Sequence, residues 1–287
     1  MAGRRELEQR LHALGDIDAI LGVMKNLALM ESGKISRFLV AQQEMAASLE
    51  AIAAEFVTCC PQPRPAAGET IDVLLLIGSQ RGFCGEFNDL LLGALTTAEE
   101  GSYKPLRIAV GDKLAGRIGV DIALAGPYAV EEIGQVIQLV MEALSDLLAR
   151  SAGGGSPRIV ALYHDPDCAG VVARQLAPFV EQVRQGTSYD FPPLLTIAPE
   201  TFYAQLAEQH LLAAINEVFH RSLMAENRFR LNHIEGASHR MERRIDELKR
   251  KQTLARQEEI IEEIEAILAS AELDAEETKG VFGTTGL

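Results

Sequence analysis

Two long stretches with helical periodicity flank a middle segment in which the pattern of apolar residues changes. The first 60 residues and everything after Pro199 contain no proline, whereas all 11 prolines and 16 of the 24 glycines lie between Pro61 and Pro199. Proline breaks a helix interior and glycine weakens one. The pattern therefore predicts helical segments at 1–60 and 201–273, a central domain at 69–200, and an acidic, then glycine-rich tail at 274–287.

In the first stretch, apolar residues recur every seven positions, which is the spacing of a coiled-coil seam. The seam is Leu7, Leu14, Leu21, Ala28, Ile35, Leu49 and Phe56, interrupted at Gln42; a companion stripe is Ile17, Met24, Phe38, Met45 and Ile52, interrupted at Glu31. An ordinary amphipathic helix on a globular core would show similar periodicity. The length of the seam favours a coiled coil, and the prolines at 61, 63 and 65 then predict a short extended linker.

The last third of the chain carries a seam of the same kind. Its members are Leu206, Leu211, Ile215, Val218, Phe219, Leu223, Ile234, Met241, Ile245, Leu248, Gln252 and Ala255, followed by Ile260, Ile261, Ile264, Ile267 and Leu268. A helix of about 70 residues would be on the order of 105 Å long, too long to be covered by its own small domain. Because one helix enters the central domain and the other leaves it, we expect the two to pair as a long antiparallel coiled coil.

The middle segment alternates short apolar runs with helical stretches. The predicted strands are Ile71–Ile77, Leu106–Val110, Val120–Leu124, Arg158–Tyr163 and Leu194–Ile197, and the predicted helices are Glu86–Thr97 and Val130–Arg150. Strands that alternate with helices are typical of an α/β fold with a mainly parallel sheet. The fold class is therefore α/β, with a mainly parallel-sheet domain between the two coiled-coil helices.

A glycine-rich turn, Gly78–Gly85, follows the first strand and precedes a helix, which is where phosphate-binding loops occur. Its glycines have neither the G-x-G-x-x-G spacing nor the G-x-x-x-x-G-K-[ST] spacing. We therefore interpret Arg81, Gly82, Cys84 and Gly85 as a structural turn rather than a nucleotide site. Cys84 lies near a helix start, which can lower a thiol pKa, but a small buried residue is the favoured interpretation.

The composition and the spacing of particular residue types argue against several classes of function. A net charge of −14 and the absence of tryptophan argue against nucleic-acid binding. We expect no transmembrane helix and no signal peptide, because neither kind of apolar run occurs. The four cysteines and six histidines lack metal-ligand spacing, so the cysteines are interpreted as reduced thiols. No catalytic residue, metal or cofactor is predicted.

Charge is segregated along the last helix. Seven basic residues lie within positions 240–256 against three acids: they are Arg240, Arg243, Arg244, Lys249, Arg250, Lys251 and Arg256. From Glu258 to the end there are nine acids and one lysine. A solvated helix surface with intrahelical ion pairs is one interpretation. The other is an electrostatic track that faces an acidic protein partner.

Three separated parts of the sequence resemble the gamma subunit of F-type ATP synthases. The first is Arg5-Glu6-Leu7 with Arg10-Leu11, Ile20 and Met24; the second is Arg81-Gly82-Phe83-Cys84-Gly85 with Phe87-Asn88; the third comprises Glu226 and Arg230, then Leu254-Ala255-Arg256-Gln257 with Ile260 and Glu262-Glu263-Ile264. Their order and spacing fit the chain to about Ala271. Departures at Ile20–Met24, at His233–Arg240 and in the tail indicate a divergent branch, with an alternative sodium-linked complex as one alternative.

The resemblance implies a Rossmann-like central domain that binds no nucleotide. It also implies a non-catalytic rotor shaft that couples ion flow to ATP synthesis or hydrolysis. Implied partners are three alpha and three beta subunits, the epsilon subunit and the membrane ring of c subunits, at the cytoplasmic face of the plasma membrane. The predicted partner-interface residues are Glu226, Arg230, Arg243, Arg244, Lys249, Arg250, Lys251, Arg256 and Gln257. The coupling ion, the direction of turnover, the role of the tail and any inhibition stay open.

Two other functions compete with the rotor. The helices alone would also suit a coiled-coil adaptor with an α/β head and no rotary role. A nucleotide-dependent enzyme would bind its nucleotide at the turn Gly78–Gly85, and the glycine spacing of that turn disfavours this function.

Overall fold

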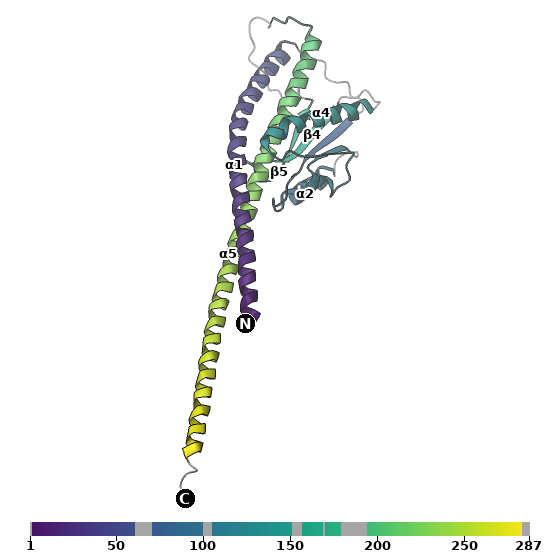
Figure 1. The fold of residues 1–287 in the computed structure, drawn as a ribbon. Helices are drawn as coiled ribbons and strands as arrows, with labels where there is room; N and C mark the ends of the chain where they lie inside the picture. The colour runs from purple at the N-terminus through teal and green to yellow at the C-terminus, as the bar shows by residue number, and fades with distance from the viewer. Residues whose placement is uncertain are drawn as a thin grey trace. The chain divides into compact units, whose positions relative to one another are not determined.

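The computed structural model describes residues 2–60, 71–99, 105–150, 157–168, 170–178 and 194–282 (Figure 1). The chain divides into two compact units, one formed by residues 1–24 with 235–287 and the other by residues 25–234. Each unit is described by itself. The predicted proline linker at 61–65 and the end of the tail at 283–287 lie outside the described residues.

Two helices dominate the secondary structure: α1, Ala2–Cys59, and α5, Pro199–Phe282. Each is continuous, and α5 runs nine residues past the predicted end at 273. In the unit of residues 25–234 they lie antiparallel, with the Phe56 ring 4.9 Å from that of Phe202 and the Phe38 ring 5.8 Å from that of His220. The predicted antiparallel pairing of the two terminal helices is confirmed.

The packing face of α1 is partly different from the predicted one. The main seam is correct, since Leu21, Ala28, Ile35 and Phe56 are buried. The companion stripe was wrong for most of its members. Ile17, Met45 and Ile52 are exposed, and Phe38 is exposed although its ring contacts that of His220, whereas Met24 is half-buried. The second inward-facing row lies four residues after each seam position and comprises Leu11, Asp18, Lys25, Ser32, Leu39, Ala46, Ala53 and Cys60, all buried or half-buried. Hydrophobicity does not reveal this row, because several of its members are polar or small.

The sheet contains five strands in the order β3-β2-β1-β4-β5. Their bounds are β1 Ile71–Ile77, β2 Leu106–Val110, β3 Ile122–Leu124, β4 Pro157–His164 and β5 Val171–Ala177. The first four are parallel, so that Leu75 pairs with Ile108 on one side and with Ala161 on the other, and β5 is antiparallel to β4. The predicted parallel α/β sheet is thus confirmed for four strands.

The predicted fifth strand at Leu194–Ile197 was wrong. That segment has no strand structure, and Leu194 is 94% exposed. The fifth strand is instead β5, an edge strand that contains Arg174 and Gln175. An edge strand has one protein neighbour, so it tolerates polar side chains and lacks the apolar pattern that marks an interior strand.

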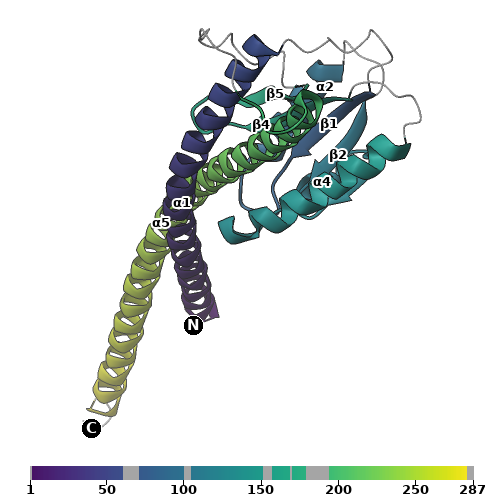
Figure 2. The same cartoon turned by 90° about the horizontal axis from the view of Figure 1, so that it is seen from above.

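Helices cover both faces of the sheet (Figure 2). On one face lie α4, Ile133–Arg150, which follows a short 3-10 turn at Val130–Glu132, and the part of α5 around Ile215–Met224. On the other lie α2, Phe87–Glu99, and the short α3, Asp112–Ala115. Ile35 of α1 joins the larger core. This half of α5 therefore packs on the sheet as well as on α1, which the prediction of a helix pair alone did not include.

In the other unit, residues 2–24 of α1 lie antiparallel to the C-terminal part of α5. Ser238 Oγ donates to Asp18 Oδ1 at 2.9 Å, and Gln252 Nε2 to Glu8 Oε1 at 3.4 Å. Leu21 and Leu248 are buried, whereas every side chain from Ile260 to Leu268 is exposed. Across the described ranges, none of the helices combines the length and the apolar character that crossing a membrane requires.

Candidate functional site: the turn after β1 and the outer surface of α5

The crevice at the carboxyl ends of β1 and β4 is where an open α/β sheet of this order would bind a ligand, because the strand order reverses there. Side chains of the chain itself occupy it. Ser79 N donates to Asn88 Oδ1 at 3.0 Å, and Asn88 Nδ2 donates back to Ser79 Oγ at 2.8 Å. A Cβ on Gly78 would lie 2.4 Å from the Leu114 Cβ, so backbone and α3 are in close contact.

The side chain of Gln80 lies at the carboxyl ends of β1, β2 and β3. Its Nε2 donates to Asp112 Oδ2 at 2.7 Å and to Tyr128 Oη at 3.1 Å. Its Oε1 accepts from the backbone N–H groups of Asp112 at 3.1 Å and of Gly126 at 2.7 Å. A buried amide with four partners is fully satisfied. The side chain of Gln80 therefore joins the loops after β1, β2 and β3. The backbone N–H groups of Asp112 and Gly126 already donate to it and are not available to bind a phosphate.

His164 is the last residue of β4. It is buried, its Nε2 donates to the Phe87 carbonyl at 2.7 Å, and its ring lies 4.1 Å from that of Phe87 and 5.1 Å from that of Phe229. Phe87 and Phe229 meet edge to face at 5.5 Å. This histidine therefore faces the interior of the domain.

The turn Arg81–Gly85 has two residues with positive φ, Phe83 at 62° and Gly85 at 55°. The Phe83 side chain is 56% exposed, whereas Cys84 is 5% exposed and its Sγ donates to Ser79 Oγ at 3.2 Å. Burial raises the pKa of the Cys84 thiol, so the reactive thiolate is disfavoured at neutral pH. Arg81 lies over the Tyr128 ring, 5.6 Å from its centre.

Glu226 and Arg230 do not face outward, as a partner-interface role requires. Each is 5% exposed, and they form an ion pair with each other. Arg230 Nη1 donates to Asn227 Oδ1 at 2.6 Å, and its Nε donates to the Gly82 carbonyl at 3.4 Å. The structure therefore corrects the prediction for these two residues: within this chain they contact the turn after β1. Their spacing of four residues is that of a helical pair, and it does not show what the pair binds.

The other predicted interface residues lie on the surface of α5 in the unit of residues 1–24 and 235–287. Arg243, Arg244, Lys249, Arg250, Lys251, Arg256 and Gln257 are all exposed. The inward positions between them are Met241, Ile245, Leu248, Gln252 and Ala255. One of the basic residues forms an ion pair along the helix, Arg244 with Glu247 at 2.8 Å. The basic side chains are thus accessible to another molecule.

A second polar cluster joins α5 to the sheet and was not predicted. Arg221 contacts Glu217 at 2.9 Å, Asp165 at 3.0 Å and Asp167 at 3.1 Å, and Glu217 also binds Arg174 of β5 at 2.7 Å. The spacing of Glu217 and Arg221 is a recognisable helical pair. The partner Arg174 was missed because β5 itself was missed, and Asp165 follows the predicted strand β4 but is brought to α5 only by the fold.

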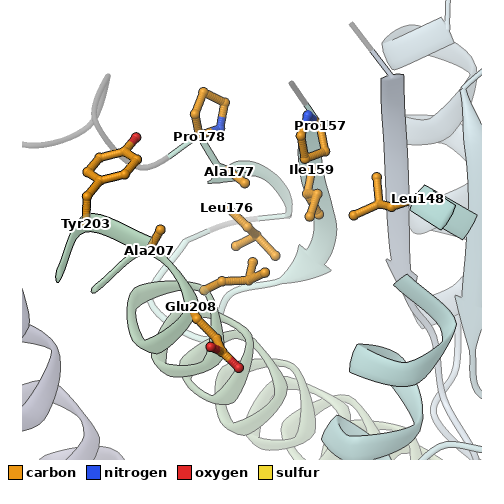
Figure 3. Close-up of a pocket in the computed structure, with 10 residues that line it drawn as sticks. Leu148, Pro157, Ile159, Leu176, Ala177, Pro178, Tyr203, Ala207 and Glu208 are labelled. Atoms are coloured by element: carbon orange, nitrogen blue, oxygen red, sulfur yellow. The ribbon is translucent and has the colours of Figure 1, made fainter. Parts of the chain in front are cut away.

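An apolar pocket of about 290 Å³ opens between the end of α4, the edge of the sheet and the start of α5 (Figure 3). Its lining includes Leu148, Ile159, Leu176, Tyr203 and Leu211. Glu208 is the one ionisable carboxylate among the lining residues. These side chains offer no pair of groups for acid–base or nucleophilic chemistry.

Burial lowers the pKa values of His164, His210 and His220. A histidine with a lowered pKa in the folded state takes up protons more readily when unfolded, so its contribution to stability is lost as the pH falls below the ordinary value of 6.5. We expect the stability of His164→Asn to depend less steeply on pH between about 5 and 7 than that of the unmodified chain. Urea unfolding at several pH values measures this slope.

The difference in slope between the two proteins can be assigned to His164. Above pH 5, Glu131 and Glu217, whose pKa values lie below the ordinary 4.5, stay ionised in both proteins. The unmodified chain is the reference for the slope. An equal slope for His164→Asn and the unmodified chain would contradict the assignment.

Comparison with known proteins points to one family. The sequence model of the family described as "ATP synthase" matches residues 3–273. The "ATP synthase gamma chain" of Bdellovibrio bacteriovorus is 22% identical over 292 residues, which are 95% of this chain and 99% of that protein. The protein of the same name from Clostridium botulinum (strain Langeland) is 22% identical over 205 residues, 69% of this chain and 71% of that one.

Solved structures show the same fold. A chain of the Euglena gracilis mitochondrial ATP synthase OSCP/F1/c-ring structure has a TM-score of 0.66 at 15% identity, covering 100% of this chain and 97% of that chain. A chain of the rotor of the same enzyme has a TM-score of 0.62 at 15% identity, with 90% and 99% covered. The long paired helices and the mainly parallel sheet are thus a known architecture.

Proposed function

This chain belongs to the family of ATP synthase gamma chains, whose match spans residues 3–273, and we propose that it is the central rotor shaft of a rotary F-type ATP synthase. In this role it couples transmembrane ion flow to ATP synthesis or hydrolysis at other subunits. One observation supports the proposal most: α1 and α5, of 58 and 84 residues, are each uninterrupted and pair antiparallel within both units. Paired continuous helices resist bending and twisting more than one helix does.

We propose further that the chain performs no bond chemistry. The crevice at the carboxyl ends of β1 and β4 is filled by Asn88, Phe87 and His164. Gln80 uses the neighbouring amide groups, and the Cys84 thiol is held protonated by burial. The sheet then serves as a rigid attachment for α5 rather than as a nucleotide-binding domain.

The proposed partners are three alpha and three beta subunits around the paired helices, with the epsilon subunit and the membrane ring of c subunits at the sheet domain. The complex would place this chain at the cytoplasmic face of the plasma membrane. The similar chains in solved structures come from assemblies described as rotor, central stalk with c-ring, and F1 with c-ring. Those descriptions support a partner set of this kind.

The exposed basic residues of α5 are the proposed contact with alpha and beta subunits. They comprise Arg243, Arg244, Lys249, Arg250, Lys251 and Arg256, with Gln257 beside them. An acidic partner surface is favoured by their charge, and long-range attraction of this kind orients a partner before contact. Glu226 and Arg230 are excluded from this surface because they are buried.

Reversing the charge at Arg256 should weaken coupling in the assembled complex. Arg256→Glu places an acid opposite the proposed acidic surface, and we expect the ATP-synthesis rate to fall by about two- to fivefold, the size expected for an exposed charge contact. Arg158→Glu, at an exposed position of β4, is the matched control and should change the rate little. Equal rates for the two variants would remove Arg256 from the interface.

Reconstitution tests the rotor role itself. Purified alpha and beta subunits are mixed with and without this chain, and assembly and ATPase activity are measured. We expect the chain to enter the assembly in single copy and to change its activity. No difference between the two mixtures would overturn the proposal. The alternative of a coiled-coil adaptor instead predicts a stable self-dimer of the isolated chain, which light scattering would detect.

A further inference from the structure

Two charged residues of α5, one helical turn apart, bind the backbone of the turn after β1 from both sides. The backbone N–H of Arg81 donates to the Glu226 carboxylate. The guanidinium of Arg230 donates from Nε to the Gly82 carbonyl at 3.4 Å. Backbone groups of two consecutive residues of an irregular turn are thereby satisfied by side chains of a helix that is distant in the sequence, with Gly82 and Arg230 lying 148 positions apart.

The pair is enclosed. Glu226, Asn227 and Arg230 are all buried, and Arg230 contacts the other two through its Nη atoms. A buried ion pair adds little to stability compared with apolar residues of the same shape, because both charges lose their hydration. Its contribution is instead to specify one arrangement of the groups that it binds.

The turn needs such a contact because its backbone is strained. Phe83 has a φ of 62°, a left-handed conformation that is unfavourable for a residue with a side chain. That conformation turns Phe83 outward and Cys84 inward, where the thiol packs with Phe87, Ala225 and Phe229. Strain of this kind persists only where the surrounding structure maintains it.

We propose that Glu226 and Arg230 are positioning residues that fasten the turn Arg81–Gly85, and through it the sheet, to α5. The mechanical consequence, that force on α5 reaches the sheet at this point, rests on the proposed rotor function. The fastening itself does not, because it concerns contacts within residues 25–234. Cys84 provides a built-in reporter: it is 5% exposed while the turn is held, and it becomes accessible when the turn is released.

The first experiment measures alkylation of Cys84 by N-ethylmaleimide in the full chain, with Cys59, Cys60 and Cys168 changed to alanine. In this background Arg230→Met should speed the reaction by about tenfold or more, because a local opening exposes the thiol. The loss of the Arg230 charge by itself acts in the opposite direction, since that charge lowers the pKa of Cys84. Faster alkylation therefore reports exposure and not a change in thiol ionisation.

Arg221→Met is the matched control. Arg221 also lies on α5 and also binds a turn at the carboxyl end of the sheet, through Asp165 and Asp167. Its loss should lower global stability without changing the alkylation of Cys84 under native conditions. Equal rates for Arg230→Met and the unmodified chain would overturn the proposal, as would an equal increase for Arg221→Met. If Arg230→Met does not fold by circular dichroism, Arg230→Lys, which keeps the charge but loses the planar fork, takes its place.

The second experiment uses the assembled complex and separates the two proposals. If the chain does not assemble with alpha and beta subunits at all, the rotor function fails while the alkylation result still decides the fastening. If the complex assembles, Arg230→Met should retain ATP hydrolysis but transport fewer ions per ATP than Arg221→Met. Equal coupling in these two variants would overturn the mechanical role of the fastening.

Discussion

The Phe219→Ala variant is expected to lose about 3–5 kcal/mol of its free energy of unfolding, the range for truncating a fully buried phenylalanine. Phe219 is 1% exposed and lies in the core that α5 shares with the sheet and α4. Its removal leaves a cavity that the surrounding β-sheet cannot close, because interiors are densely packed. Urea unfolding followed by circular dichroism measures the loss.

Phe83→Ala is the control for that experiment. The same atoms are removed, but from a side chain that is 56% exposed, so we expect a change of less than about 0.5 kcal/mol. A small loss in Phe219→Ala, comparable with that of Phe83→Ala, would mean that α5 does not pack on the sheet as the structure shows.

Arg221→Met is expected to cost about 3 kcal/mol, the lower end of the range for breaking a buried ion pair. The lower end applies because the Arg221 side chain is 17% exposed and because Glu217 keeps a second partner in Arg174. The acids left behind include Asp165, whose side chain is 11% exposed, and its uncompensated charge accounts for most of the loss. The same urea experiment measures it.

The exposed pair of Arg244 and Glu247 supplies the comparison. Their side chains are 55% and 58% exposed, and Arg244→Met should cost less than about 0.5 kcal/mol because solvent screens the pair. A loss of similar size in Arg221→Met and Arg244→Met would argue that the Arg221 cluster carries no special stability. A further comparison is Asp165→Asn, which removes one charge of the cluster and should recover part of the loss in the Arg221→Met background.

Local patterns were sufficient for the four long helices and for four strands, whereas the short helix α3 was not predicted. The seven-residue spacing of Leu21, Ala28 and Ile35 depends on the helical repeat alone, and all three are buried as predicted. The apolar runs of β1, β2 and β4 are buried on both faces of a parallel sheet, so they are continuous and easy to recognise. The edge strand β5 lacks that burial and was therefore missed.

Side-chain partners were much less predictable. Ile17 and Ile52 belong to an apolar stripe that the sequence places in the helix pair, but both are exposed. The row of α1 that faces inward instead is small or polar at several positions, including Ser32 and Ala46. Both rows lie near the seam of α1, since three and four residues are almost equally close to one helical turn. The choice between them depends on the opposite helix, which the local pattern does not contain.

The sequence by itself determined that two proline-free helices flank an α/β domain, because helix and strand periodicities are local properties of the chain. The tertiary structure decided which surfaces those helices bury and what the charged residues bind. Arg230 shows the reason: its contact with Gly82 joins positions 148 apart, and only the packing of α5 against the end of the sheet brings them together. Arg256 carries the same charge but remains on the surface. Residue type gives the chemistry, and the fold decides whether it is directed inward or toward a partner.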